Sequence, residues 1–214
     1  MKTIRLISAL AVILLLWSCS PATRITGSWV DPSAKGKMVN GKTLFIASLT
    51  RNMEVRTKLE NAIAEQATSH NLKTIKSTTQ FSPDFYQDLP PEKELLAKIR
   101  NTGADVILTI SLINKESETR YVRGTQHYSP FTSYRWYGGF YSYFNYWRPM
   151  LYEPGYYVTD KTYFMETNLY DMESNRLIWS AQSETVNPGS IDNFVSNYPA
   201  ILIDQLVKDG LLSM

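Results

Sequence analysis

Residues 104–113 read ADVILTISLI, and they form the most strand-like run in the chain. Nearly every position is apolar or β-branched, which predicts a buried strand in the centre of a sheet. The run TLFIASL at 43–49 is too short for a core helix and predicts a second buried strand. Two shorter runs, at 25–30 and 72–77, predict further strands. Strands of this kind need apolar helices packed against them.

Two helices are predicted between these strands. Asn52 can cap the first, and Asn71 is a suitable residue to stop it. Residues 90 and 91 are both proline and open the second helix, which Gly103 ends. Apolar residues recur at three- and four-residue spacing in the first helix, at Val55, Leu59, Ala62, Ile63 and Ala67.

The last third of the chain predicts a hairpin followed by a helix. Residues 162–170 and 176–185 are β-prone and are separated by a short polar turn, so they should pair as antiparallel strands. Trp179 is expected to anchor the core. Ser190 can cap the final helix, in which Pro199 predicts a kink or a break into two helices.

The order of elements predicts an α/β domain of the α+β two-layer type. A mixed sheet would carry about three helices and a long aromatic insertion between two strands. We expect one globular domain over residues 25–214, with the insertion at 121–157 and a short tether at 20–24. A chain of 214 residues with 43% apolar content is of the size for one such domain.

The first 19 residues have the pattern of a secretory signal. Lys2 and Arg5 precede an apolar run of about a dozen residues, which is too short to span a bilayer comfortably. The run ends in LWSC at 16–19, which resembles the bacterial lipobox. This resemblance implies that Cys19, the only cysteine, is lipidated and becomes the mature N-terminus. The alternative is a plain signal peptide with an incidental cysteine.

The charge balance argues against a nucleic-acid partner. Lys and Arg number 22 against 20 Asp and Glu, and removal of the signal takes away Lys2 and Arg5. The mature chain is therefore close to neutral and contains no long basic run. We expect no nucleic-acid binding.

Residues 121–157 contain fifteen of the 27 aromatic residues of the chain. Tyr, Trp and Arg are enriched at interface hot spots, and Arg stacks on aromatic rings. The candidate contact groups are therefore Arg135, Trp136 and Tyr137, together with Tyr146, Trp147 and Arg148. Three interpretations remain open: the rings bind a protein partner, they pack back over the sheet as an ordered flap, or Trp136 and Trp147 stack on a sugar.

One formal motif points to a nucleotide site. The sequence GKMVNGKT, from Gly36 to Thr43, fits the P-loop pattern letter for letter. The phosphate-binding mechanism of that loop needs a strand before it and a helix after it. Here Lys42 and Thr43 lead directly into the predicted strand at 43–49, so we expect no nucleotide binding.

Metal and hydrolase motifs are not found. The two histidines, His70 and His127, have no second His or Cys at ligand spacing, and no serine lies in a nucleophile-elbow pattern. Asp171 is expected to serve the turn, and Asp105, just after a helix stop, is expected to have a structural role and not a catalytic one. We therefore expect no metal, no cofactor and no catalytic residue, with an enzyme of unrecognised type as the alternative.

Several stretches together resemble an uncharacterised family of Gram-negative, Bacteroidetes-like lipoproteins. They are SWVDP at 28–32, LFIASLT with Arg56 and Glu60 in the helix that follows, GADVILTISL, and the ending TNLYDMESNRLIWSAQSETVNP. The family also carries a Tyr/Gly-rich insertion before the last hairpin. More remotely, the order of strands and helices is similar to the TolB amino-terminal domain and to CsgG-type envelope proteins, which implies protein–protein work in the periplasm.

These observations lead to one prediction of function. The chain is expected to be a lipid-anchored binding or scaffolding domain of the cell envelope, placed on the outer membrane and facing the periplasm. Ser20 stands where an aspartate would resemble a retention signal, which favours the outer membrane. A glycan-binding module that uses the aromatic insertion, for peptidoglycan or another polysaccharide, is the alternative.

Overall fold

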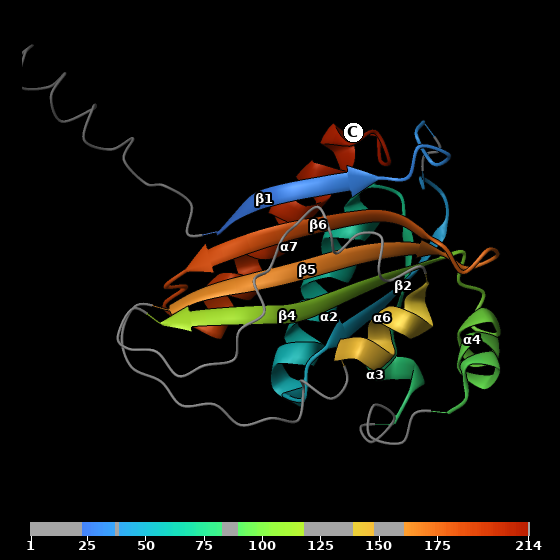
Figure 1. The fold of residues 1–214 in the computed structure, drawn as a ribbon, viewed down its shortest axis with the longest axis horizontal. Coiled ribbons are helices and arrows are strands. Elements are labelled where there is room, and N and C mark those ends of the chain that lie inside the picture. Colours follow the sequence, from blue (N-terminus) through green and yellow to red (C-terminus); the bar gives the residue numbers. More distant parts are fainter. Residues whose placement is uncertain (1–22, 37–38, 83–89, 118–138, 148–160, 214) are drawn as a thin grey trace, which may run out of the picture.

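The computed structural model describes residues 23–36, 39–82, 90–117, 139–147 and 161–213 (Figure 1). Six strands form one mixed sheet in the order β1-β6-β5-β4-β2-β3. Strand β2 pairs in parallel with β3 and β4, and all other neighbours pair antiparallel. The bounds of the strands are β1 Thr23–Val30, β2 Thr43–Leu49, β3 Lys73–Lys76, β4 Val106–Ser117, β5 Lys161–Asp171 and β6 Leu177–Val186.

Helices lie against both faces of the sheet. Among the described residues they are α2 Met53–Ser69, α3 Ser77–Gln80, α4 Glu92–Arg100, α6 Phe140–Trp147 and α7 Ile191–Lys208. Helices α2 and α7 lie on one side of the sheet, and α6 lies on the other (Figure 1). The mixed sheet and the α+β class predicted from the sequence are confirmed. The sequence predicted two layers and about three helices, whereas the described residues form five helices distributed over both faces.

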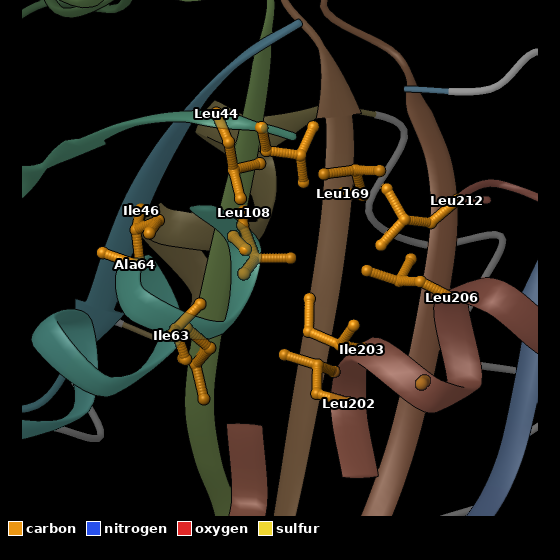
Figure 2. Close-up of a cluster of buried hydrophobic side chains, with 14 of the residues drawn as sticks. Leu44, Ile46, Ile63, Ala64, Leu108, Leu169, Leu202, Ile203, Leu206 and Leu212 are labelled. Atoms are coloured by element: carbon orange, nitrogen blue, oxygen red, sulfur yellow. The ribbon is translucent and has the colours of Figure 1, made fainter. Parts of the chain in front are cut away.

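The first core lies between the sheet and the pair α2 and α7. Side chains of alternate residues in β2 and β4 point into it, among them Leu44 and Ile46 from β2 and Leu108 from β4 (Figure 2). Ile63 of α2 and Leu202 of α7 meet them from the helices. This alternation places the intervening residues of the same strands on the opposite face.

The second core occupies that opposite face. Phe45 and Ala47 of β2 and Ile107 of β4 are its strand residues. Leu95 and Ile99 of α4 cover part of it. Aromatic residues of α6 cover another part. The sheet is therefore buried on both faces near its centre.

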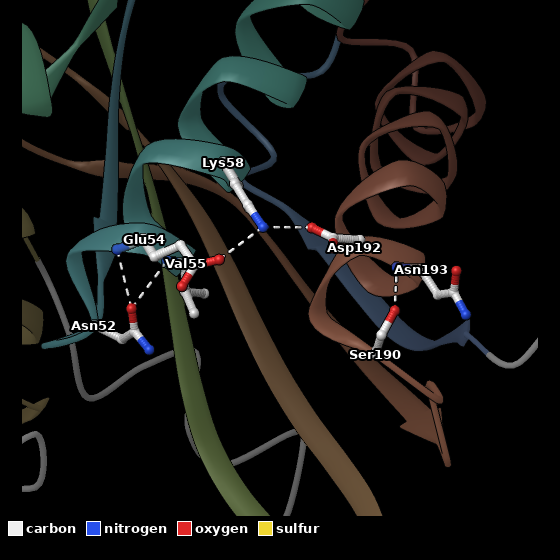
Figure 3. Close-up of polar contacts among 7 residues, drawn as sticks. All are labelled: Asn52, Glu54, Val55, Lys58, Ser190, Asp192 and Asn193. Carbon is white, nitrogen blue, oxygen red and sulfur yellow. Dashed lines mark hydrogen bonds and ion pairs between the residues drawn. The ribbon is translucent and has the colours of Figure 1, made fainter.

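The predicted helix boundaries follow from their caps. The Asn52 side-chain oxygen accepts hydrogen bonds from the backbone N–H groups of Glu54, at 3.0 Å, and Val55, at 3.2 Å (Figure 3). Asn71, just after α2, has a φ of 61°, and Gly103, after α4, has a φ of 83°. Both stop positions therefore use the left-handed backbone that Asn and Gly tolerate best.

Trp179 anchors the first core, as predicted. Its side chain is fully buried, and its Nε1 donates a hydrogen bond to an Asp209 carboxylate oxygen at 2.7 Å. Helix α7 continues through Pro199 as one helix instead of breaking into two. Pro199 is buried, so its apolar burial offsets part of the cost of the backbone hydrogen bond that proline cannot donate.

One boundary predicted from the sequence is wrong. Strand β1 begins at Thr23, so Thr23 and Arg24 belong to the sheet and not to the tether at 20–24. The Thr23 hydroxyl shares a hydrogen bond of 2.9 Å with the Thr185 hydroxyl of β6. Cross-strand pairing with β6 therefore extends the strand towards the N-terminus.

A buried carboxylate on α2 connects three elements of the domain. One oxygen of Glu60 accepts hydrogen bonds from the Ser48 backbone N–H of β2, at 2.9 Å, and the Ser77 hydroxyl of α3, at 2.6 Å. The other oxygen accepts from the backbone N–H and hydroxyl of Thr78, at 3.0 and 2.9 Å. Each partner would lose its hydrogen bond if the carboxylate were removed.

Replacing Glu60 by Ala should lower the free energy of unfolding by about 3 kcal/mol, because the substitution leaves several buried donors without an acceptor. Urea denaturation of the variant and the parent measures this loss. Glu65→Ala is the matched control, since Glu65 is exposed on the same helix and should change stability by less than about 0.5 kcal/mol. Equal losses in the two variants would contradict the structural role of Glu60.

Candidate functional site

The aromatic insertion is described at its centre, where residues 140–147 form α6. Of the six predicted contact residues, only Tyr146 and Trp147 lie in this helix, as its last two residues. Their side chains lie outside the described part of the chain, as do Arg135, Trp136, Tyr137 and Arg148 in full. The predicted lipidation residue, Cys19, also lies outside the described residues.

Helix α6 has a buried side formed by three rings. Phe140, Tyr143 and Phe144 are each no more than 2% exposed, whereas Ser142 and Asn145 on the other side are exposed. The three buried positions are related as i, i+3 and i+4, which is the spacing of one helical face. Sequence reasoning missed this helix, although that spacing after Gly138 and Gly139 was the signal that could have found it.

The buried rings of α6 contact the sheet at Tyr170 of β5. The Phe140 and Tyr170 rings meet nearly edge-on, with centroids 5.9 Å apart and planes inclined by 76°. The Tyr143 and Tyr170 rings are 6.4 Å apart, and the Phe140 and Phe144 rings are 5.8 Å apart. Such aromatic pairs contribute roughly 0.5–1.5 kcal/mol each beyond the area that they bury. The centre of the insertion is thus packed onto the second core.

Next to Tyr170, the same face of the sheet carries a buried polar cluster. Glu166 is opposite Ser111 of β4 and Gln182 of β6 in the strand register, and it is only 1% exposed. Asn168 donates to one Glu166 carboxylate oxygen at 3.1 Å, and Gln182 donates to the other at 3.2 Å. We call these four residues, Ser111, Glu166, Asn168 and Gln182, the Glu166 cluster.

Burial raises the pKa of the Glu166 carboxyl from its ordinary value of 4.5 to about 7. Hydrogen bonds from the side chains of Asn168 and Tyr143 oppose this rise by stabilising the charged form. Tyr143 lies on α6, so the protonation of Glu166 is linked to the contact between the insertion and the sheet. Near neutral pH the carboxyl can hold or release a proton at this contact.

The signal for Glu166 in the sequence was an acidic residue inside an otherwise apolar hairpin strand, MET followed by NLY at 165–170. Period-two alternation assigns Met165 and Leu169 to one face and Glu166 and Asn168 to the other. The sequence could not reveal that this second face is buried too, because the helix that covers it was not predicted.

The other carboxylates considered in the sequence serve the backbone. An Asp105 oxygen accepts from the Thr43 N–H at 2.8 Å. An Asp171 oxygen accepts from the backbone N–H and the hydroxyl of Ser174, at 2.8 and 2.6 Å, and so closes the β5–β6 turn. Both structural roles are as predicted.

The P-loop-like stretch lacks the required context. Thr43 is the first residue of β2, so a strand follows the motif where a phosphate-binding loop would need a helix.

Within the described residues, no group of three or more His, Cys, Asp or Glu side chains could hold a metal ion. None of the helices in the described ranges is long and apolar enough to cross a membrane.

Comparison with known proteins yields structural likeness without sequence relatives. No protein-family model and no curated protein sequence matches the chain. Among solved structures, the chain is similar to PelC from Paraburkholderia phytofirmans, solved as a dodecamer, with 12% identity and a TM-score of 0.43 over 90% of this chain and 99% of that one.

Two further similar structures have lower TM-scores. Lipoprotein GNA1162 from Neisseria meningitidis is 10% identical, with a TM-score of 0.39 over 78% of this chain and 99% of that one. The LpoB C-terminal domain from Escherichia coli is 14% identical, with a TM-score of 0.35 over 69% of this chain and 84% of that one. Likeness of this size says nothing about the activity or the partners of this chain.

Replacing Glu166 by Gln should make the folded state less sensitive to pH. Because the folded pKa of about 7 lies above the ordinary 4.5, the parent is most stable when Glu166 is protonated and loses stability as the pH rises from 4.5 through 7. Gln resembles the protonated acid, so the variant should match the parent near pH 4 and exceed its unfolding free energy by up to about 3 kcal/mol at pH 8.

Urea denaturation between pH 4 and 8.5 measures this difference. Glu116→Gln is the control, because Glu116 is exposed on β4 and lies outside the Glu166 cluster. If the two variants differ from the parent by the same amount at every pH, the account of Glu166 is wrong.

Proposed function

We propose that this chain is a lipid-anchored binding or scaffolding domain of the cell envelope, on the outer membrane and facing the periplasm. The observation that supports binding is the attachment of the aromatic insertion to the sheet through Phe140, Tyr143 and Phe144 of α6. This attachment gives the centre of the insertion a fixed place on the domain.

The proposed contact residues flank that attachment. Tyr146 and Trp147 are the last two residues of α6, and Arg148 follows them. Arg135, Trp136 and Tyr137 precede the first helical residue, Phe140, by three to five positions. Both groups are therefore close in sequence to a helix that is packed on the core. Pre-ordering of a contact segment reduces the entropy lost on binding, which favours recognition of a protein partner.

The N-terminal sequence supports the anchor. An apolar signal run ends at Cys19, and the folded domain begins only four residues later, at Thr23. A lipid on Cys19 would hold the domain close to the membrane surface. A single lipidated end can hold a protein at a membrane without any spanning helix.

Replacing Cys19 by Ala should move the protein from the membrane to the soluble envelope fraction, because the thiol that would carry the lipid is removed. Fractionation of cells with antibody detection measures the distribution. Cys19→Ser provides a second variant without a lipidation site and should behave in the same way. Firm membrane retention of both variants would contradict the lipid anchor.

Replacing both Trp136 and Trp147 by Ala should remove most of the protein partners recovered by envelope pull-down, since these rings are the largest proposed contact groups. The matched control is the double Phe variant, which keeps an apolar ring at both positions and should retain more partner than the Ala variant. An unchanged urea midpoint shows that the variants remain folded.

Two other outcomes would contradict protein scaffolding through these rings. Loss of retention on peptidoglycan or polysaccharide, with protein partners unchanged, would favour the glycan-binding alternative. Unchanged behaviour in both assays would indicate that the insertion serves only to cover the sheet.

A further inference from the structure

A groove with a volume of about 720 Å³ lies at the end of the domain where α2 and α7 begin. It is next to the carboxyl end of β2 and the middle of β4, where the parallel pairing of these two strands ends at Leu49 and Ser111. Pockets of 300–1,000 Å³ with a mainly apolar lining are typical of small-molecule sites. Its lining includes Ser48 of β2, Val55 and Leu59 of α2, Ile110 of β4, Lys161 of β5 and Phe194 of α7.

The polar residues of this lining favour an anionic group. Lys161 contributes the one positive charge among the described lining residues, and no carboxylate is among them. The N-terminal ends of α2 and α7 add a partial positive charge at the same place. The Ser48 hydroxyl is buried in the lining and has no hydrogen-bond partner among the described residues. The groove thus combines apolar walls with a polar region suited to one negative charge.

Ion pairs of one lysine join the N-terminal parts of α2 and α7 beside the groove. The Lys58 ammonium group of α2 lies 2.6 Å from an Asp192 carboxylate oxygen of α7 and 2.7 Å from a Glu54 oxygen (Figure 3). One ammonium group compensates one of these two carboxylates, so the three side chains together keep one net negative charge, which lies outside the lining. Ser190 caps α7 through a hydrogen bond from the Asn193 N–H, at 3.0 Å.

Exposed apolar side chains surround the same end of the domain. Four large apolar residues of the described chain are markedly exposed: Met53 by 37%, Leu112 by 43%, Val186 by 43% and Ile191 by 42%. They come from the beginning of α2, the outer part of β4, the end of β6 and the beginning of α7. Apolar exposure gathered at one end, next to an apolar groove, marks an interaction surface.

The N-terminal tether leaves from this end as well. Thr23 is paired with Thr185, next to Val186 and to the lining residues that follow β6. Thr23 is four positions after Cys19 in the sequence, and an extended chain of four residues spans at most about 14 Å. If Cys19 is lipidated, the groove lies at the end of the domain nearest the lipid surface.

We propose that this groove binds a long-chain fatty acid, with its carboxylate towards Lys161 and the N-terminus of α7 and its hydrocarbon chain along Leu59, Ile110 and Phe194. A fatty acid has the two chemical parts that the lining accommodates, a long apolar chain and one anionic end. The closeness of the groove to a membrane rests on the proposed lipid anchor. The shape of the groove and the positive charge of Lys161 do not depend on that anchor.

Photolabelling tests the proposal on the full chain in membrane vesicles. Photoreactive palmitic acid, with its reactive group in the middle of the hydrocarbon chain, should label peptides that contain residues 48–59, 110–112 or 187–194, and an excess of ordinary palmitic acid should abolish the labelling. Mass spectrometry identifies the labelled peptides. Labelling spread evenly over the chain, or labelling that palmitic acid does not compete, would overturn the proposal.

Two pairs of measurements sharpen the test. Val55→Trp places a large ring in the groove from a half-buried position and should remove most of the labelling, whereas Val186→Trp, at an exposed position outside the lining, should leave it unchanged. Equal effects of these two variants would contradict binding in the groove.

Lys161→Gln should weaken labelling by photoreactive palmitic acid and leave labelling by the uncharged photoreactive alcohol unaffected. Equal effects on the two probes would contradict the assigned orientation.

The experiments distinguish failure of the fatty-acid site from failure of the proposed lipid anchor. Because the probe is supplied in the vesicles, labelling of the groove reports on the groove whether or not Cys19 carries a lipid. Fractionation of the Cys19 variants reports on the anchor alone. A chain that is released by Cys19→Ala but shows no competed labelling would keep the anchor and lose the fatty-acid site.

Discussion

Strand β4 lies between β5 and β2, and every residue from Val106 to Ser111 is buried. Alternate side chains of this strand point to opposite faces, so a strand without access to water on either side requires cover on both. Helices α2 and α7 supply that cover on one face. On the other face, α4 covers one part and the aromatic α6 covers another.

Because the second face of the sheet needs cover, the centre of the aromatic insertion has a structural role. The central turns of the insertion are part of the fold, because Phe140, Tyr143 and Phe144 complete the second core. Recognition by the residues that flank this contact in the sequence is the function that we propose. The Glu166 cluster lies under this contact, where the Glu166 side chain is almost fully buried, and this burial raises the pKa of its carboxyl.

Much of the fold could be predicted because its signals are local. Asn52 and Gly103 mark helix ends through their own backbone preferences, and Trp179 lies in a strand whose alternation is clear. The parts that were missed depend on distant contacts. Helix α6 has only two turns with aromatic residues on most sides, so its period is obscured, and the environment of Glu166 is created by elements distant in sequence. The beginning of β1 at Thr23 likewise depends on its pairing with Thr185 of β6.

The central claim is that α6, at the centre of the insertion, is held on the sheet. Native-state hydrogen exchange of the α6 amides tests it most directly, and the Tyr143 amide, which donates to the Gly139 carbonyl at 3.2 Å, is the most informative. The account predicts that this amide is protected, and that Phe140→Ala reduces its protection more than that of the β4–β5 amides. Exchange of the α6 amides at the rate of an unfolded peptide, with the β4–β5 amides still protected, would contradict it.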